Sequence, residues 1–327
     1  MGRPDRVVAA APYFNEADVV AIRLRELVGV VDAHVFCEAA WTYAGSPKPF
    51  GCLEAVFDAL PAGEKVAPSV TWDGNGWRRV EVSTSLGDVV VVELVEEPPA
   101  SFQDVYQGFG DRERWRSENY QRFMLGEALP GWLEATDVVA LSDVDEVPSR
   151  RLLEWYVRGD VSALVQPAIP LHVGALNWRW RVAVPVILRV FRADRVDRAG
   201  GLEGVRRSAC AVLDPSAQWS QQAARGEFPG DLMSAFGWHL SYLGGADAIR
   251  YKVREAAHPE LERDEFVGPG VVEARLADGL DLFGRGGWRD AEWVGVDAAA
   301  WPGVVLDDPA AWARLMVASP SDPTRLW

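Results

Sequence analysis

Short apolar runs alternate with amphipathic segments through the first half of the chain. Val7–Ala11, Ala33–Cys37 and Val89–Val95 have the length and composition that predict buried strands. Ala17–Leu27 instead repeats its apolar residues at three- and four-residue steps, which predicts an amphipathic helix. Asn15 is the expected N-cap of that helix. The first forty or so residues therefore form a strand–helix–strand unit.

The same alternation continues toward the middle of the sequence. Helices are predicted at Asp111–Ala128 and Arg151–Arg158, and strands at Val138–Leu141 and Val161–Val165. Strands that alternate with helices are typical of a mostly parallel sheet flanked by helices. We therefore predict an α/β fold of the Rossmann type, with a single large domain over residues 1–290. Residues 291–327 are expected to form a C-terminal tail that packs on this domain.

The clearest chemical signal follows the predicted strand Val138–Leu141. There the chain continues as Ser142-Asp143-Val144-Asp145-Glu146-Val147-Pro148. Ligands bind at the carboxyl ends of strands in open α/β sheets, so Asp143 and Asp145 would lie at the ligand-binding edge. Two carboxylates at this spacing can share one divalent cation. The alternative for so short a motif is a strand that ends in a solvated acidic turn.

Two further segments favour a ligand site at the same edge. Glu38 ends the second predicted strand, and the next loop holds Lys48 between two prolines, where a cation suits a diphosphate. Gly237-Trp238-His239 places a histidine in a short strand near glycines, which let the backbone approach a ligand. The alternatives are an ordinary surface loop for Lys48 and a core position for His239. The first strand lacks a following Gly-x-Gly-x-x-Gly motif, which argues against a dinucleotide-binding domain.

Residues 177–207 combine tryptophans with many arginines. Trp178 can stack on a sugar ring, although a tryptophan in a predicted strand can equally belong to the core. Eight arginines follow it: Arg179, Arg181, Arg189, Arg192, Arg195, Arg198, Arg206 and Arg207. They form either a patch that follows a phosphate backbone or a solvated face paired with acids.

Overall charge and cysteine content narrow the classes of function. The 327-residue chain has a formal net charge of −15, which disfavours a protein that binds polyanions without sequence preference. Its three cysteines have unrelated spacings, which indicates neither a disulfide framework nor a zinc site. No apolar run has the length of a secretory signal or a membrane span, so we expect a cytoplasmic protein without a membrane partner.

Many of these segments, in this order, resemble glycosyltransferase family 17. These are β-1,4-N-acetylglucosaminyltransferases related to the enzyme that adds the bisecting N-acetylglucosamine to N-glycans. The resemblance extends from about Pro12 to Arg285. It rests on Phe14-Asn15-Glu16, Ile22-Arg23-Leu24-x-Glu26-Leu27, Glu38, Gly45-Ser46-Pro47-Lys48-Pro49, Trp115-x-x-Glu118-x-x-Gln121-Arg122, Leu141–Pro148, Asn177-Trp178-Arg179-Trp180, Gly237–Gly245, His258-Pro259-Glu260 and Gly279-x-Asp281-Leu282-Phe283-x-Arg285.

The resemblance implies a GT-A-like fold, with a donor half at about residues 1–150 and an acceptor half at about 151–290. It also implies inverting transfer of N-acetylglucosamine, or another hexose or hexosamine, from a UDP-sugar to a hydroxyl of a glycan. Mn²⁺ or Mg²⁺ would stabilise the leaving diphosphate, held by Asp143, Asp145 and His258. The catalytic candidates are Glu146, Glu260 and His239. The donor-binding candidates are Asn15, Glu16, Glu38, Lys48, Arg122 and Trp238, and the acceptor-binding candidates are Trp178 and Arg179.

Other functions fit parts of the sequence. The arginine-rich segment would suit the same transfer onto a hydroxymethylated base of phage DNA. A non-catalytic protein that binds nucleotide sugars or carbohydrates would keep the fold without turnover, although the intact acidic triplet argues against it. A phosphatase of the haloacid dehalogenase type is rejected, because that class carries its Asp-x-Asp motif on the first strand. The sequence identifies no protein partner.

Overall fold

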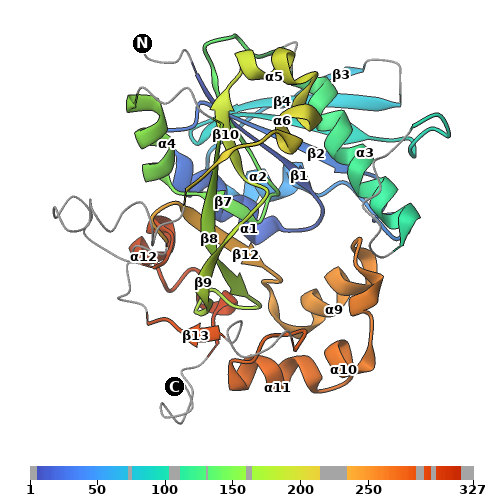
Figure 1. The fold of residues 1–327 in the computed structure, drawn as a ribbon, viewed down its shortest axis with the longest axis vertical. Helices are drawn as coiled ribbons and strands as arrows, with labels where there is room; N and C mark the ends of the chain where they lie inside the picture. Colours follow the sequence, from blue (N-terminus) through green and yellow to red (C-terminus); the bar gives the residue numbers. More distant parts are fainter. Residues whose placement is uncertain are drawn as a thin grey trace.

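A computed structural model of the chain describes residues 6–72, 76–102, 111–129, 132–159, 164–213, 234–284, 291–295 and 300–317. Within these ranges, 13 strands join in one sheet, with helices on both of its faces (Figure 1). The strands are β1 (Val7–Tyr13), β2 (Ala33–Ala39), β3 (Ser69–Trp72), β4 (Trp77–Thr84), β5 (Gly87–Leu94), β6 (Val138–Leu141), β7 (Glu146–Pro148), β8 (Val165–Val173), β9 (Trp178–Pro185), β10 (Arg189–Arg192), β11 (Ala211–Leu213), β12 (Gly237–Ser241) and β13 (Ala291–Trp293). The α-helices are α1 (Ala17–Leu27), α2 (Cys52–Ala59), α3 (Arg112–Ala128), α4 (Arg150–Arg158), α5 (Asp194–Ala199), α6 (Leu202–Arg207), α9 (Gly245–Glu255), α10 (Asp264–Val267), α11 (Val271–Asp278) and α12 (Gly303–Asp307).

The centre of the sheet is parallel, and the apolar runs of the sequence form it. β1 pairs in parallel with β2 and with β6, and β2 pairs in parallel with β5. Nearly every residue of these four strands is buried, because helices cover both faces of the sheet. Since parallel strands all end at the same edge, the residues after β1, β2 and β6 are brought close together there.

Antiparallel strands extend this centre on both sides, so the complete sheet is mixed. β4 and β3 follow β5 on one side, and β10, β8, β9 and β13 follow β6 on the other. β12 runs parallel to β8 and antiparallel to β7. Most of the strand predicted at Val161–Val165 lies outside the described residues, and β8 begins at Val165.

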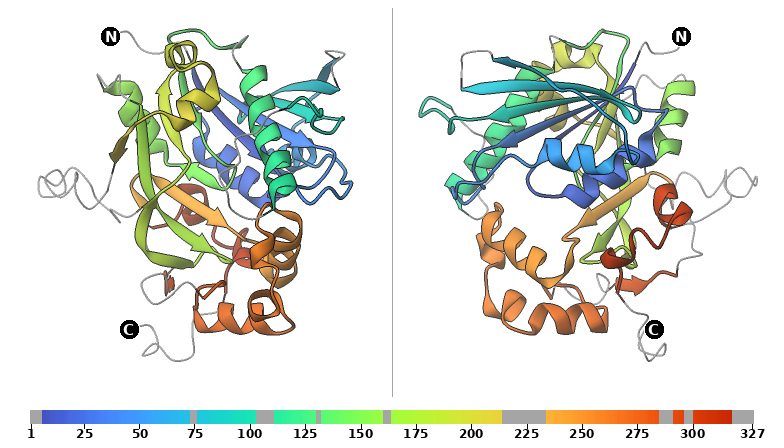
Figure 2. Two further views of the ribbon diagram at one scale, coloured as in Figure 1. Left: turned by 45° about the vertical axis from the view of Figure 1, so that its right-hand side comes forward. Right: turned by 180° about the vertical axis from the view of Figure 1, so that it is seen from behind.

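The helices form two layers around the sheet. Leu24 of α1 and Val56 of α2 pack on one face, where α4 also lies, and α3, α5 and α6 cover the other (Figure 2). Leu125 of α3 and Leu202 of α6 belong to the core of that second face. Burial of each such side chain contributes about 1.5–3 kcal/mol, so these contacts fix where the helices stand over the strand ends. The predicted helices at α1, α3 and α4 are confirmed, and so is the α/β class.

Two smaller clusters complete the molecule. Ile249 of α9 and Leu276 of α11 pack against Leu171 of β8, which places the α9–α11 helices below the carboxyl edge of the sheet (Figure 1). Near the C-terminus, Trp301 and Trp312 pack against the α1 side of the fold. Across the described ranges, no helix combines the length and the apolar character that crossing a membrane would require.

Candidate active site

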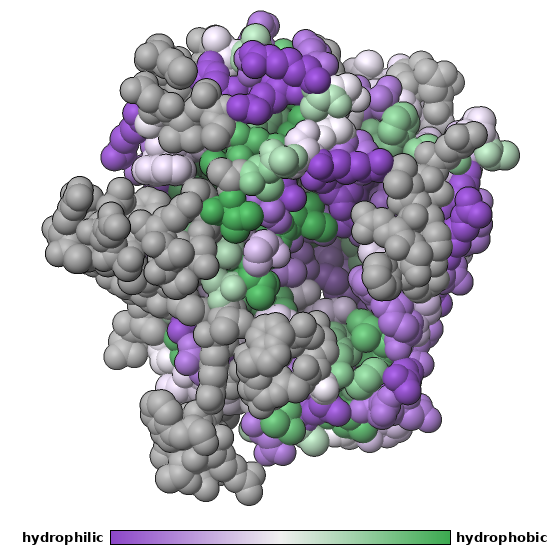
Figure 3. Space-filling model, in the orientation of Figure 1, coloured by the Kyte–Doolittle hydropathy of each residue, from purple (hydrophilic) through white to green (hydrophobic). Residues whose placement is uncertain are grey.

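A pocket of about 250 Å³ opens at the carboxyl ends of β1 and β6. α3, β12 and α9 supply its other walls. Figure 3 shows hydrophilic side chains around the hollow on this face of the molecule. Six of the residues predicted from the sequence line the pocket: Glu16, Arg122, Asp143, Asp145, His239 and His258.

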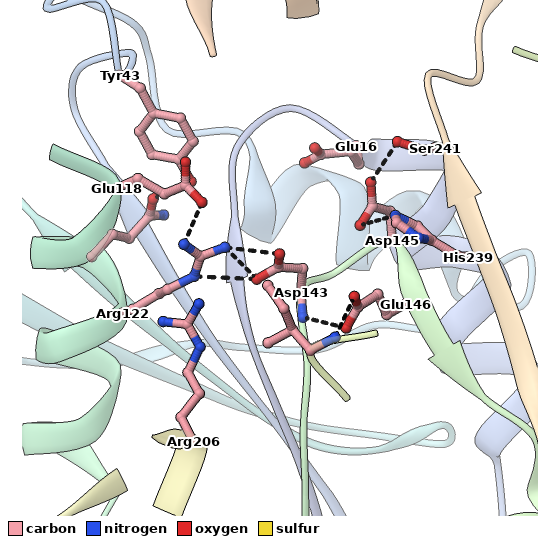
Figure 4. A network of polar contacts seen from close by, with 12 residues as sticks. Glu16, Tyr43, Glu118, Arg122, Asp143, Asp145, Glu146, Arg206, His239 and Ser241 are labelled. Atoms are coloured by element: carbon pink, nitrogen blue, oxygen red, sulfur yellow. Dashed lines mark hydrogen bonds and ion pairs between the residues drawn. The ribbon is translucent and has the colours of Figure 1, made fainter. Parts of the chain in front are cut away.

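Asp143 is held by a guanidinium from helix α3. Nη2 of Arg122 lies 2.8 Å from both carboxylate oxygens of Asp143, and Nη1 forms an ion pair with Glu118 one helical turn away (Figure 4). Burial alone would lower the pKa of Arg122, but Asp143 and Glu118 outweigh it and raise that pKa. Arg122 therefore stays charged and links α3 to the acidic turn.

Asp145 has basic partners from β12 and α9. Its Oδ2 lies 2.9 Å from Nζ of Lys252, and its Oδ1 lies 3.5 Å from Nε2 of His239. The hydroxyl of Ser241 donates to the same carboxylate at 3.2 Å (Figure 4). Burial would raise the pKa of Asp145, but Lys252 and His239 outweigh it and hold that pKa well below its usual range. Asp145 is therefore an ionised carboxylate within the pocket.

Glu16 occupies the position where helix α1 begins. Its Oε2 accepts hydrogen bonds from the backbone N–H groups of Phe14 and Asn15, at 3.1 and 2.9 Å. Its Oε1 pairs with Lys252 at 2.9 Å. The N-cap residue is Glu16, so the prediction that Asn15 caps the helix is wrong. Asn15 is exposed and does not line the pocket, unlike its neighbours Phe14 and Glu16.

The acidic turn between β6 and β7 is supported from beneath by a buried arginine. Nη1 of Arg23 donates to Ser142 Oγ at 2.9 Å and to the carbonyl of Glu146 at 3.1 Å. Burial lowers the pKa of Arg23 to about 10 against the attraction of Glu146 and Asp145. Arg23 therefore fixes the turn that presents the two aspartates.

Glu146, a catalytic candidate, lies behind the pocket wall and does not line it. Its side chain is buried, and Oε1 accepts a hydrogen bond from the backbone N–H of Ile187 at 2.9 Å. Burial and the nearby charge of Asp143 raise the pKa of Glu146 to about 7. This position suits a residue that supports the acidic turn better than one that contacts an acceptor.

His258 and Glu260 form a pair at the pocket rim. Nδ1 of His258 lies 2.7 Å from Oε1 of Glu260, and the ring of Trp115 packs edge-on at 5.0 Å. The His258 side chain is 43% exposed and lines the pocket, whereas Glu260 does not line it. A histidine oriented by a carboxylate, with access to a pocket, has the arrangement of a general base.

The predicted donor-binding pair Glu38 and Lys48 lies outside the pocket. The two side chains form an ion pair, and Glu38 is fully buried. Glu38 also accepts hydrogen bonds from the backbone N–H groups of Gly51 and Cys52, at the start of α2. Lys48 is therefore held in place as the counterion of a structural carboxylate, which corrects the prediction that it faces a diphosphate.

Both predicted site tryptophans are core residues in the structure, which corrects their proposed roles. The indole N–H of Trp238 donates to the carbonyl of Ala300, and that of Trp178 donates to Leu276, both from buried positions. Gly279, with φ of +66°, lies so close that a Cβ there would come 2.6 Å from the Trp178 ring. Both indoles are covered by C-terminal segments, so neither ring is open to a ligand.

Among the described residues of 177–207, four arginines form ion pairs with acids. Arg179, the other predicted acceptor residue, pairs with Glu292 of β13. Arg198 pairs with Asp194, and Arg206 and Arg207 both pair with Glu203, in each case within one helical turn. The exposed pairs of Arg198 and Arg207 fit the solvated face that was the alternative to a phosphate-binding patch. Arg206 also lies beside Arg122 and lines a small cavity next to Asp143 (Figure 4).

The carboxylates of the pocket bear on the predicted divalent ion. Among the described residues, no three carboxylate, imidazole or thiol groups form a ready metal-binding cluster. Mg²⁺ in nucleotide sites usually takes one or two carboxylates plus phosphate oxygens, so Asp143 and Asp145 are a sufficient protein contribution. The lining residues also include four carboxylates, against the two strong bases Arg122 and Lys252. An anionic ligand therefore needs added positive charge.

Six polar or aromatic lining residues were missing from the predicted site: Phe14, Tyr43, Glu118, Ser241, Tyr242 and Lys252. Glu118 gave a signal, because its four-residue spacing from Arg122 predicts a pair across one helical turn. Lys252 also gave one, as one of three lysines in the chain, on the helix after the Gly-Trp-His segment. Nothing local in the sequence indicates that either residue faces the acidic turn.

The fold and pocket define an α/β protein with an acidic site at the carboxyl ends of its central strands. No protein-family model matches the chain, and no solved structure gives a significant match. Over 299 residues it is 24% identical to the beta-1,4-mannosyl-glycoprotein 4-beta-N-acetylglucosaminyltransferases of Rattus norvegicus and Homo sapiens. The alignments cover 88% of this chain and 49% of each relative, so the chain spans about half the length of these curated relatives. The similarity supports a distant relationship to glycosyltransferases.

Proposed function

We propose that the chain is an inverting glycosyltransferase that moves N-acetylglucosamine, or another hexose or hexosamine, from a UDP-sugar to a hydroxyl of a glycan. One observation carries the proposal. Acids and bases from β1, α3, the β6–β7 turn, β12 and α9 converge on one pocket at the strand ends. In open α/β sheets this edge is where nucleotides bind, and the distant relatives are N-acetylglucosaminyltransferases.

On the donor side, Arg122 and Lys252 supply positive charge beside the diphosphate. Phe14 and Tyr43 stack with ring centroids 4.9 Å apart and form an aromatic wall of the same pocket. Asp143 and Asp145 would hold Mn²⁺ or Mg²⁺, which would neutralise the charge that develops on the departing diphosphate. The role of the two aspartates is then to orient the donor, with Arg23 and Glu146 fixing their turn.

On the acceptor side, His258 is the proposed general base. With Nδ1–H donating to Glu260, the ring leaves Nε2 free to accept the proton of the acceptor hydroxyl. The hydroxyl oxygen bonds to the anomeric carbon as the bond from that carbon to the diphosphate oxygen breaks, and UDP leaves. One displacement of this kind inverts the anomeric configuration. This assigns His258 a role different from that of a metal ligand.

A glycan acceptor has more support than modified DNA. Four of the eight arginines that would follow a phosphate backbone are engaged with the acids Glu292, Asp194 and Glu203. Only a turnover assay separates the transferase from a non-catalytic sugar-binding protein, because the binding protein would bind the same donor without consuming it.

The test is release of UDP from a panel of UDP-sugars with Mn²⁺, with glycans or hydroxymethylated DNA as acceptors. We expect UDP release with a glycan and a product whose anomeric configuration, measured by NMR, is inverted. His258→Gln should lower kcat by about 10²-fold with little change in donor KM, because general base catalysis contributes about that much. Glu260→Gln should cost about tenfold, since it acts by orienting His258.

Glu262→Gln is the matched control, because Glu262 pairs with Arg114 and does not line the pocket. It should leave kcat within about twofold of the wild-type value. Donor binding without any UDP release would support the non-catalytic alternative. The complete absence of UDP-sugar binding and turnover would show that the proposal is wrong.

A further inference from the structure

Lys252 occupies a central position among the carboxylates of the pocket. Its Nζ lies 2.9 Å from Oδ2 of Asp145 and 2.9 Å from Oε1 of Glu16, and 5.3 Å from the ring centre of Tyr242. Only 17% of its side chain is exposed. One ammonium group therefore joins the acidic turn after β6 to the turn after β1, in the place where a bridging cation would be expected.

Donors already engage both oxygens of the Asp145 carboxylate. Lys252 and Ser241 contact Oδ2, and Nε2 of His239 lies 3.5 Å from Oδ1. A divalent ion that binds Asp145 needs a carboxylate lone pair, and an ammonium group at 2.9 Å would repel it strongly. The ion and the Lys252 ammonium therefore cannot both occupy these positions.

We propose that Lys252 is the resident counterion of Asp145 and that a divalent ion replaces it when the nucleotide binds, which frees the ammonium for a phosphate oxygen. This inference rests on the proposed function, and it assigns Lys252 a donor-binding role in that reaction. The exchange keeps the buried Asp145 carboxylate paired in both states, so the charge is never left uncompensated.

The side-chain chemistry favours movement of Lys252 and not of Arg122. Lysine carries a compact charge on a flexible four-carbon chain and binds phosphate as a point charge. Arg122 is a planar fork held by both oxygens of Asp143 and by Glu118, so its release would break several contacts at once. Lys252 is therefore the cation that can change partners within the pocket.

The test measures binding of two probes separately. Mn²⁺ binding to the protein alone is followed by electron paramagnetic resonance of the free ion. In Lys252→Met, the dissociation constant for Mn²⁺ should fall by about tenfold, because the competing cation is gone. UDP binding is then measured calorimetrically at saturating Mn²⁺, where the same variant should bind UDP about tenfold more weakly. A merely structural role for Lys252 would not produce these opposite changes.

Three further variants test whether the effect is specific to the charge at Lys252. Lys252→Arg keeps a positive charge, so its Mn²⁺ affinity should stay within about threefold of the wild-type value. Lys65→Met removes the same charge from an exposed site outside the pocket and should change neither affinity. Lys252→Gln is measured in parallel, so that the conclusion does not depend on the folding of one variant.

Unchanged or weaker Mn²⁺ binding in folded Lys252→Met and Lys252→Gln would overturn the inference. Absence of Mn²⁺ binding in the wild type, with or without UDP, would also overturn it, together with the metal part of the proposed function. UDP release in the transfer assay is independent of both results. A protein that turns over UDP-sugars but fails the Mn²⁺ test would therefore keep the proposed transferase function and lose this inference.

Discussion

The pocket and the arginine-rich segment both gather charged side chains, but their ion pairs are built differently. In the pocket, the ion-pair partners are far apart in the sequence: Arg122 and Asp143 are separated by 21 residues, and Lys252 and Asp145 by 107. In the arginine-rich segment, Arg198 pairs with a residue four positions away on the same helix.

The charged side chains of the two regions also differ in their exposure to solvent. The side chain of Arg122 is 8% exposed and that of Lys252 is 17% exposed, whereas that of Arg198 is 71% exposed. Exposed pairs contribute about 0–1 kcal/mol, and an unpaired charge left in a buried site costs several times more. The loss of a partner from the pairs of Arg122 and Lys252 should therefore cost far more than the loss of the local, exposed pair between Arg198 and Asp194.

Removal of one charge from each region should separate them by activity. Asp145→Asn should lower UDP release from the donor by about 10³-fold, because Asp145 would help to hold the divalent ion that neutralises the departing diphosphate. Asp194→Asn makes the same chemical change in the arginine-rich segment and should leave the rate within about twofold of the wild-type value. The measurement is initial velocity at saturating donor.

If Asp145→Asn and Asp194→Asn lowered the rate equally, the charges of the pocket would have no special role in the reaction. Wild-type activity in Asp145→Asn would further show that the acidic turn takes no part in the reaction. Circular dichroism spectra of both variants establish that any loss of rate is not a loss of fold.

The same comparison can be made with stability. Arg122→Met leaves two carboxylates, Asp143 and Glu118, without their shared partner, and should lower the free energy of unfolding by about 3 kcal/mol. Arg198→Met removes an exposed pair and should change it by less than about 0.5 kcal/mol. Urea denaturation of each variant gives both values. Addition of Asp143→Asn to Arg122→Met should recover part of the loss, and no recovery would mean that packing, not charge, explains it.

The centre of the fold could be predicted from the sequence because its signals are local. Apolar runs predict β1, β2, β5 and β6, and the periodicity of α1 and α3 is clear without any tertiary information. β8 was harder, because it contains Pro167 and Pro170, and prolines argue against a strand in the interior of a sheet. In the structure, an irregularity in the β8–β9 register follows Pro170.

The site also contains residues that a local segment predicts and residues that only tertiary contacts bring into place. Asp143 and Asp145 follow a recognisable strand, so their place at the sheet edge could be predicted from a single segment. Lys252 reaches Asp145 only because α9 packs below that edge, which depends on contacts between distant segments. Trp178 shows the opposite failure: alternation in β9 cannot reveal that residues near 276–279 cover its ring.

The smallest expected effect concerns a buried base without an acidic partner, His34 in β2. It is fully buried, and among the described residues neither of its ring nitrogens has a hydrogen-bond partner. Burial, together with the positive charge of Arg23, lowers the pKa of His34 to about 3. The unfolded chain, with a histidine pKa of about 6.5, therefore binds a proton that the folded state excludes. The stabilising contribution is complete above pH of about 6.5 and is lost as pH falls toward 3.

Between pH 7 and pH 5 this histidine should account for about 2 kcal/mol of lost stability. His34→Leu abolishes that titration and should make the loss of stability over this pH range smaller by the same amount, measured by urea denaturation at both pH values. His172, which burial also keeps neutral with a pKa of about 4, remains in the variant, so part of the acid sensitivity should persist. An unchanged pH dependence in His34→Leu would mean that His34 finds a proton acceptor in the folded state. In that case burial would not lower the pKa of His34, and His34 would not differ in this respect from the paired bases of the pocket.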